Sequence, residues 1–215
     1  GRMIGTVERA NTDQRRLANM MVGREVILRV DKREAKPKEV RLEVENLRIQ
    51  EAEKTRPTVD GVNLRIRAGE VLGIAGIEGN GQSELVEAIA GLLEPTSGRV
   101  LLQGVDVTGM SARQRREVGL RHVPEDRNER GLIASDATAM NSVLGDVHRE
   151  PYSGRFGLLD MDAIRKHAER LVSEYDVRPA STTVLAAAYS GGNAQKLIIA
   201  RELERNPRVL IAAQP

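Results

Sequence analysis

Apolar and polar residues alternate along two stretches in the first third of the chain, at residues 41–49 and 62–67. A period of two is typical of strands that bury one face. Shorter strand-like segments are predicted at 3–7, 99–102, 120–123 and 209–213. The alternation therefore predicts several short strands spread along the chain.

Residues 70–75, Glu-Val-Leu-Gly-Ile-Ala, are apolar at odd and even positions alike. Such a run is expected of a strand in the middle of a sheet, buried on both faces. It leads directly into a glycine-rich turn, after which Leu85, Ala88 and Ile89 recur at helical spacing. The sequence therefore predicts a strand, a glycine turn and a helix in this order.

Further helices are predicted at 12–21, 111–117, 160–175 and 191–204. Asp160 is suited to cap the third of these, because its carboxylate can accept hydrogen bonds from the first turn. From about residue 135 the pattern is mainly helical. Strands that alternate with helices, with one helical block inserted, predict an α/β fold.

Residues 31–39 carry seven charges in nine positions around a proline. Such a segment has little apolar surface to bury, which favours an exposed linker. A charged surface loop inside one domain has the same composition, but a new strand pattern begins directly afterwards, so we favour the linker. The expected organisation is a first segment, 1–30, the linker, 31–39, and a main domain, 40–215.

Composition excludes several classes of function. The 215 residues include no Cys, which excludes thiol catalysis, thiolate metal sites and disulfides. All four aromatic residues lie between Tyr152 and Tyr189, so ring stacking on single-stranded nucleic acid is disfavoured. The net charge of +2 provides no basic surface for DNA or RNA.

The sharpest motif is Gly-Ile-Glu-Gly-Asn-Gly-Gln-Ser at residues 76–83. It has the P-loop spacing G-x-x-x-x-G-K-[ST], except that glutamine replaces the lysine. Its glycines let backbone N–H groups converge on an anion at a helix N-terminus, and its serine hydroxyl is placed to reach Mg²⁺. The predicted phosphate-binding residues are Gly76, Gly79, Asn80, Gly81, Gln82, Ser83 and Glu84. The alternative is a glycine-rich turn without a ligand.

Glutamine at position 82 weakens this predicted site. Its amide donates hydrogen bonds but does not neutralise phosphate charge. A unit charge pair about 4 Å apart is worth on the order of 4 kcal/mol at an effective dielectric near 20. We therefore expect binding through backbone amides and poor hydrolysis at this loop.

A second motif, Tyr-Ser-Gly-Gly-Asn-Ala-Gln at residues 189–195, opens a helix with an apolar body. A serine and two glycines at a helix start form another terminus that can accept an anion, with the Ser190 hydroxyl as a donor. Alone, this motif is also that of an ordinary helix cap. About 110 residues after a P-loop, in this order, it becomes specific.

Together the two motifs resemble a nucleotide-binding domain of an ABC transporter ATPase, over essentially residues 40–215. The resemblance implies a P-loop NTPase fold of ABC type, with an antiparallel β subdomain and an inserted α-helical signature subdomain. Val-Pro-Glu-Asp-Arg at 123–127 is similar to the segment that replaces the Q-loop in the second domain of tandem sugar-type importer ATPases. Residues 76–85, 151–177 and 211–215 look most like the nucleoside branch of these ATPases. Residues 5–8 and 20–24 resemble the tail of a preceding ATPase domain. Residues 210–215 resemble the Walker B strand, after which the family has its D-loop and H-loop, so the main domain is expected to be incomplete at its C-terminus.

Several positions depart from the family pattern where hydrolysis takes place. Ala213 stands at the Mg²⁺-organising aspartate of the Walker B strand, and Gln214 at the water-polarising glutamate. No ring precedes the P-loop to stack on adenine, because the chain has no aromatic residue before Tyr152. With Gln82, these departures imply that this half-site is degenerate.

In this family, domains pair head to tail, and each ATP lies between the P-loop of one and the signature of the other. The resemblance implies ATP and Mg²⁺ as cofactors and a preceding ATPase domain of the same polypeptide as partner. The signature residues expected to act on that partner's site are Ser190, Gly191, Gly192 and Gln195. Ser83 and, more weakly, Glu125 are expected at the metal. For Glu125 and Asp126, the alternative is pairing with Arg121 or Arg127.

The implied function is an ATP-binding subunit for nucleoside or simple-sugar import, peripheral on the cytoplasmic face of the membrane. Its further partners would be transmembrane permease subunits and, indirectly, a solute-binding protein, but no nucleic acid. Tyr152, Phe156 and Leu158 are expected either to contact the permease or to pack in the core. The alternative function is a non-catalytic, nucleotide-responsive dimerisation module. A soluble ABC protein of translation or DNA repair is disfavoured by the importer-like C-terminal residues.

Overall fold

The computed structural model describes residues 3–22, 36–77 and 79–214, which form two units, Gly1–Lys36 and Pro37–Pro215. In the first unit, the 3-10 helix η1 (Arg9–Asn11) precedes helix α1 (Gln14–Val22), as predicted for 12–21. Residues 3–7 are irregular instead of forming the predicted strand, because no described strand lies beside them to complete its hydrogen bonds. Residues 23–24 and 31–35, on which part of the predicted tail and linker fall, lie outside the described residues.

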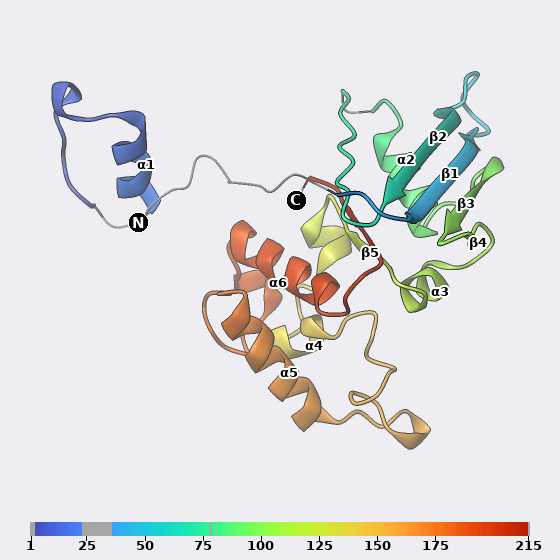
Figure 1. Ribbon diagram of the computed structural model, residues 1–215. Helices are drawn as coiled ribbons and strands as arrows, with labels where there is room; N and C mark the ends of the chain where they lie inside the picture. Colours follow the sequence, from blue (N-terminus) through green and yellow to red (C-terminus); the bar gives the residue numbers. More distant parts are fainter. Residues whose placement is uncertain (1–2, 23–35, 78, 215) are drawn as a thin grey trace. The chain divides into compact units, whose positions relative to one another are not determined.

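An antiparallel sheet forms the start of the second unit, with strand order β2-β1-β3-β4 (Figure 1). Its strands are β1 (Val40–Ile49), β2 (Val59–Arg67), β3 (Ser97–Leu102) and β4 (Val105–Asp106). Leu42 of β1 lies opposite Leu102 of β3, and Val44 opposite Val100, so the apolar side chains of both strands share one face. This face forms one hydrophobic core with Ile89 of helix α2 (Gln82–Ala90).

Arg115 ties helix α3 (Ala112–Glu117) to the C-terminal end of α2. Its side chain is buried and donates hydrogen bonds to the carbonyl oxygens of Ala88 (2.6 Å) and Ile89 (2.8 Å). These are carbonyls at the end of α2, where a cation is favourable. Ser111 begins α3 with a capping box to Gln114, which explains the short helix predicted here.

The rest of the second unit combines a parallel strand pair with a helical block. Strands β5 (Leu120–Val123) and β6 (Val209–Ala212) pair in parallel. Between them the chain forms η2 (Arg127–Gly131, a π-helix), α4 (Thr138–Ser142), η3 (Arg155–Gly157), α5 (Met161–Glu174), η4 (Ala186–Ala188) and α6 (Gly191–Leu203). Figure 1 shows α4, α5 and α6 packed together, separate from the antiparallel sheet.

Helix α5 follows its sequence pattern closely. Asp160 accepts a hydrogen bond from the backbone N–H of Ala163 over 2.9 Å, which confirms the predicted cap. Ile164, Ala168 and Leu171 are fully buried on one face. The α/β fold class, with an antiparallel β part and an inserted helical block, is confirmed.

Residues 70–75 do not form the predicted buried strand. Val71 is 90% exposed and Ile74 52%. A cavity of about 400 Å³, lined by Leu72 and Ile74 and by residues of β6, separates this segment from that strand. Without a neighbouring strand to complete a hydrogen-bond ladder, the segment gains nothing from an extended, paired conformation. The glycine turn and the helix that were predicted to follow are both present.

Among the described residues, no helix is both long enough and apolar enough to cross a membrane.

Candidate nucleotide-binding site

The predicted phosphate loop leads into the N-terminus of α2. Gly81 is the N-cap residue, with a φ of 94°, and the described helix begins at Gln82. A Cβ at Gly81 would lie 2.4 Å from the carbonyl oxygen of Thr58, so this position fits only glycine. Asn80 N–H bonds to the carbonyl oxygen of Ile77 over 3.3 Å, which closes the turn. Glu78 lies outside the described residues.

Gln82 folds back over its own loop. Its Nε2 donates a hydrogen bond to the carbonyl oxygen of Ile77 over 3.2 Å. A Cβ at Gly76 would lie 1.7 Å from this same Nε2, so the amide rests directly on Gly76. The residue at the P-loop lysine position thus makes hydrogen bonds to the loop and brings no positive charge to it.

Ser83, in the first turn of α2, is linked to the ends of two other segments through Glu125. The Ser83 hydroxyl donates to Glu125 Oε2 over 3.2 Å. Gln214 Nε2 donates to the other carboxylate oxygen of Glu125. A cavity of about 510 Å³ is lined by Ser83, Glu125 and Ala213, among others. One carboxylate therefore faces the space beside Ala213, where the family pattern has its aspartate.

Two charged residues close to Glu125 in the sequence, Asp126 and Arg121, have other partners. Asp126 accepts hydrogen bonds from the backbone N–H groups of Asn128 (2.8 Å) and Glu129 (3.0 Å), which holds the start of η2. These bonds lower the pKa of Asp126. Arg121 points elsewhere and pairs with Asp146, so the alternative pairing of Glu125 or Asp126 with Arg121 is wrong.

The chemistry of the donor set fits a metal ion that arrives with a nucleotide. A serine hydroxyl and a carboxylate are oxygen ligands of the kind that Mg²⁺ prefers, and phosphate oxygens usually complete its shell. Within the described ranges, no group of three or more His, Asp or Glu side chains is placed to hold a metal without such a ligand.

The second motif begins helix α6, as predicted. Ser190 is the N-cap residue and is exposed, and its hydroxyl oxygen accepts a hydrogen bond from Asn193 Nδ2 over 2.9 Å. Tyr189 is buried, and its hydroxyl lies 2.7 Å from Thr138 Oγ1 on α4. The tyrosine therefore anchors the motif in the helical block. The Nε2 atom of Gln195 is buried without a hydrogen-bond partner.

The structure places the two motifs on different helices. The P-loop residues gather at the start of α2, whereas the signature residues gather at the start of α6 (Figure 1). In the described part of the chain, no hydrogen bond or ion pair joins one motif to the other. They are two separate helix starts.

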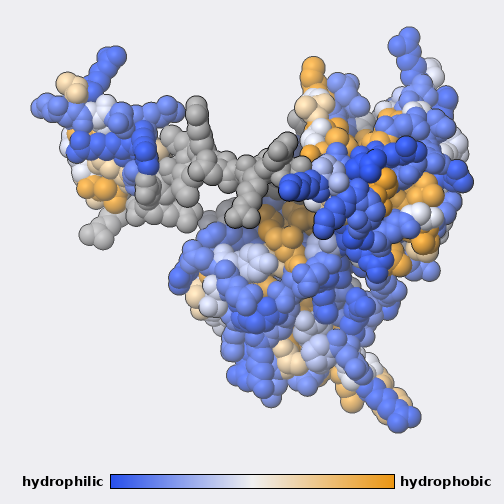
Figure 2. Space-filling view, in the orientation of Figure 1, coloured by the Kyte–Doolittle hydropathy of each residue, from blue (hydrophilic) through white to orange (hydrophobic). Residues whose placement is uncertain are grey.

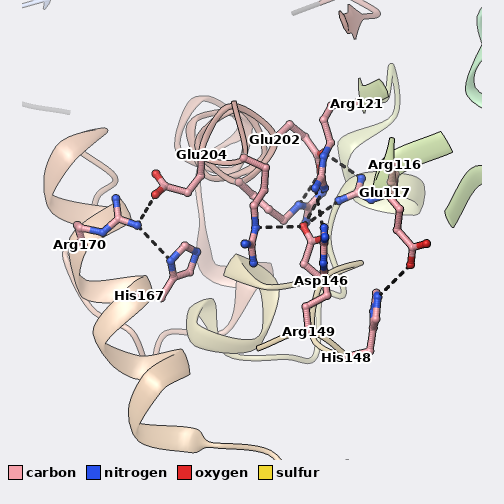
Figure 3. A network of polar contacts seen from close by, with 12 residues as sticks. Arg116, Glu117, Arg121, Asp146, His148, Arg149, His167, Arg170, Glu202 and Glu204 are labelled. Carbon is pink, nitrogen blue, oxygen red and sulfur yellow. Dashed lines mark hydrogen bonds and ion pairs between the residues drawn. The ribbon is translucent and has the colours of Figure 1, made fainter. Parts of the chain in front are cut away.

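Ion pairs join α6 to helix α3 and to strand β5 (Figure 3). Arg121 of β5 makes two hydrogen bonds to Asp146, of 2.8 and 3.3 Å. Glu202 of α6 is fully buried and accepts from Arg116 of α3 (2.9 Å) and from Arg201 (2.9 Å). Sequence reasoning missed this network, because its members are scattered in the chain and fit no known spacing.

Burial and charge shift two titrating groups near this network. Burial raises the pKa of Asp146, but the hydrogen bond and charge of Arg121, with the charges of Arg116 and Arg205, lower it further, so it lies below its ordinary value. Burial lowers the pKa of His122, whose Nε2 has no hydrogen-bond partner.

Comparisons with known proteins show which family the chain resembles. A family model described as ABC transporter matches residues 59–215. The chain is 45% identical to the nucleoside import ATP-binding protein NupA of Lactococcus lactis subsp. cremoris, over 100% of this chain and 42% of that protein. It is 41% identical to the guanosine import ATP-binding protein NupO of Bacillus subtilis, with the same coverage. The chain thus spans less than half the length of these relatives.

Solved structures show the same fold. A nucleotide-free ATP-binding cassette from an ABC transporter has a TM-score of 0.65 at 21% identity, covering 81% of this chain and 68% of that one. A dimeric post-hydrolysis state of the ATP-binding cassette MJ0796, bound to ADP and Pi, also scores 0.65, at 23% identity, covering 80% and 72%. The predicted P-loop NTPase fold of ABC type is confirmed. Because the family model matches most of its length, the chain belongs to the ABC transporter family.

Proposed function

We propose that this chain is part of the ATP-binding subunit of an importer for nucleosides or simple sugars. The names of its relatives support this solute class, since NupA and NupO are named for nucleoside and guanosine import. The subunit would lie on the cytoplasmic face of the membrane and be bound there by its permease. A solute-binding protein would deliver the solute to that permease.

The two helix starts serve two different nucleotide sites. The observation that carries this proposal is the separation of the P-loop, on α2, from the signature, on α6. Ser190, Gly191, Gly192 and Gln195 then complete a competent site on a preceding domain of the same polypeptide. The P-loop of this chain forms a degenerate half-site, because Gln82 rests on its own loop and Ala213 and Gln214 bring no carboxylate.

At the degenerate half-site, nucleotide is held by backbone N–H groups of Gly79, Asn80 and Gly81 and by the first turn of α2. Bound Mg²⁺-ATP supplies the phosphoryl group and the metal charge. Ser83 and Glu125 would hold the Mg²⁺ ion of the nucleotide through their side-chain oxygens. Gln214 donates to Glu125 and holds its carboxylate in place, but it is not a base for water.

The segment between α4 and α5 supports a contact with the permease. Phe156 is 87% exposed and Leu158 73%, whereas Tyr152 is buried against His167. Figure 2 shows hydrophobic atoms at the tip of this protruding segment, at the lower right. Tyr152 is therefore a core residue, and the two exposed residues remain for docking. Phe156→Ala should weaken assembly with the permease without changing the melting temperature.

The function is tested by ATPase measurements on the intact ATP-binding subunit. Ser190→Ala and Gly192→Ala should each lower turnover by about a hundredfold or more, as expected for lost contacts to the transferred phosphoryl group. Gln82→Ala should lower it only a few-fold, because a degenerate site contributes little. The opposite ranking would overturn the assignment of the two half-sites. The 215-residue chain alone should show negligible turnover.

The replacements at 82, 213 and 214 also favour a second candidate, a nucleotide-responsive dimerisation module without catalysis. Calorimetry of the chain with Mg²⁺-ATP and Mg²⁺-ADP tests whether its P-loop binds nucleotide, and turnover of the intact subunit separates the two candidates. Binding of either nucleotide below millimolar concentration supports a nucleotide half-site. If the intact subunit pairs on adding ATP but has no turnover, the module is correct.

A further inference from the structure

The side chain of Arg127, the first residue of η2, lies on the first signature glycine. A Cβ at Gly191 would be 2.6 Å from Arg127 Nη2 and 3.0 Å from its Cζ, so a larger residue at 191 would displace the guanidinium from this place. A Cβ at Gly192 would meet no atom within 4 Å. The two glycines thus differ, because the first seats an arginine and the second faces open space.

Arg127 has no ion pair or hydrogen bond in the part of the chain that the structure describes. Nearby, Arg130 is paired with Glu87, and the Asp126 carboxylate is used by backbone N–H groups. The Arg127 guanidinium makes no direct ion pair, although its charge acts on the carboxylate of Asp126, and it lies beside the N-terminus of α6, which is the positive end of that helix. A cation in this place is unfavourable, and an anion placed between the two would relieve it.

Hydrogen-bond donors without an acceptor are also present at the start of α6. The side chain of Ser190 makes no capping bond to the first turn of α6, and its exposed hydroxyl only accepts from Asn193. The N–H groups of Gly191 and Gly192 lie in the first turn, where no intrahelical acceptor exists. A hydroxyl, two backbone N–H groups and a guanidinium therefore all lie at the start of α6.

We propose that Arg127 is a further phosphate-binding residue of the signature site. Together with Ser190 and the N–H groups of Gly191 and Gly192, it receives the terminal phosphate of a nucleoside triphosphate held by the P-loop of the preceding domain. Its planar fork matches two phosphate oxygens and neutralises charge, which backbone N–H groups alone do not do. This inference rests on the proposed function, in which the signature serves the partner's site.

The test compares affinities of the intact subunit for a non-hydrolysable β,γ-imido ATP analogue and for ADP. Only the triphosphate has the phosphate that Arg127 would contact, so the preference for the analogue over ADP is the readout. Arg127→Gln should reduce this preference about tenfold, the size of one lost charge-assisted hydrogen bond. Arg127→Lys should retain part of it. Arg113→Gln, at an exposed ion pair on α3, is the matched control and should leave the preference unchanged.

Ser190→Ala separates this inference from the function on which it rests. If Ser190→Ala lowers the preference and both Arg127 variants keep it, Arg127 does not bind phosphate and the inference is overturned. If Ser190→Ala also keeps it, the signature does not serve a nucleotide site, and the proposed function falls as well. Since Arg127→Lys retains length and charge, it gives an answer even if Arg127→Gln fails to fold.

Discussion

The Ser83 hydroxyl donates a hydrogen bond to Glu125 Oε2 over 3.2 Å, although 42 residues separate them in the chain. This contact brings a carboxylate next to the hydroxyl that the P-loop pattern assigns to Mg²⁺. The position that supplies a carboxylate in the family pattern is Ala213, which lines the same cavity. Glu125 therefore occupies the space where a carboxylate is missing.

Replacing Glu125 by Gln should remove the Mg²⁺-dependent part of nucleotide binding. We expect the affinity for ATP in Mg²⁺ to fall about tenfold, since one charged oxygen ligand is lost, while the affinity in EDTA stays the same. Calorimetry in the two buffers measures both. Glu129→Gln, an exposed carboxylate of the same segment, is the control. An equal loss with and without Mg²⁺ would show that Glu125 does not act on the metal.

Two glycines with positive φ should respond very differently to alanine. Gly98 has a φ of 94°, and a Cβ there would lie 2.4 Å from the carbonyl oxygen of Asn46. Gly104 has a φ of 78°, but a Cβ there meets no atom within 4 Å. Gly104→Ala should cost about 1 kcal/mol of unfolding free energy, and Gly98→Ala several times more, because backbone must also move. Urea unfolding measures both, and equal costs would contradict the close approach of β1 and β3.

Asp146→Asn should be strongly destabilising. It removes the carboxylate that is hydrogen-bonded to the buried guanidinium of Arg121 and leaves only the more distant Glu202, 3.9 Å away; breaking a buried pair costs about 3–5 kcal/mol. Asp162→Asn breaks the exposed pair with Arg165 and should cost less than about 0.5 kcal/mol. Chemical unfolding at neutral pH measures the difference. Similar costs at both sites would mean that the network in Figure 3 does not hold the helical block.

Stability should decline as the pH falls from about 7 to 5, in part because of His122. Burial and the charges of Arg116 and Arg130 lower its pKa from the ordinary value of 6.5, against the opposing charges of Glu202 and Glu87. The unfolded chain therefore binds more protons in this range, so the unfolding free energy decreases with falling pH. His122→Gln should reduce this slope. A slope that equals that of the parent chain would place the pH dependence elsewhere, with His167 as the next candidate.

Local patterns were sufficient for most elements of the fold. The apolar alternation at 41–49 and 62–67 predicted β1 and β2, and Asp160 predicted the start of α5. These predictions rest on contacts between residues that are close in sequence, or on residues that share one face of one element. The predicted strand at 70–75 was wrong, because a strand also needs a neighbour, and apolar content alone does not supply one.

The candidate site was predictable only in its motifs. Glycine and serine spacing located the starts of α2 and α6, because the chemistry of a helix N-terminus is local. The contacts of Glu125 with Ser83 and of Arg127 with Gly191 join distant segments, and no spacing rule encodes them. For the same reason the partners of Arg121 and Glu202 had to be found in the structure.

Residues 71–77 form a short stretch of exposed aliphatic side chains that favours contacts between molecules. Val71, Leu72, Ile74 and Ile77 leave large aliphatic surfaces in solvent, and in the described residues β6 pairs on one side only. An open strand edge near exposed aliphatic side chains favours pairing between molecules and aggregation. A single lysine in place of Val71 should therefore raise the concentration up to which the protein stays monodisperse.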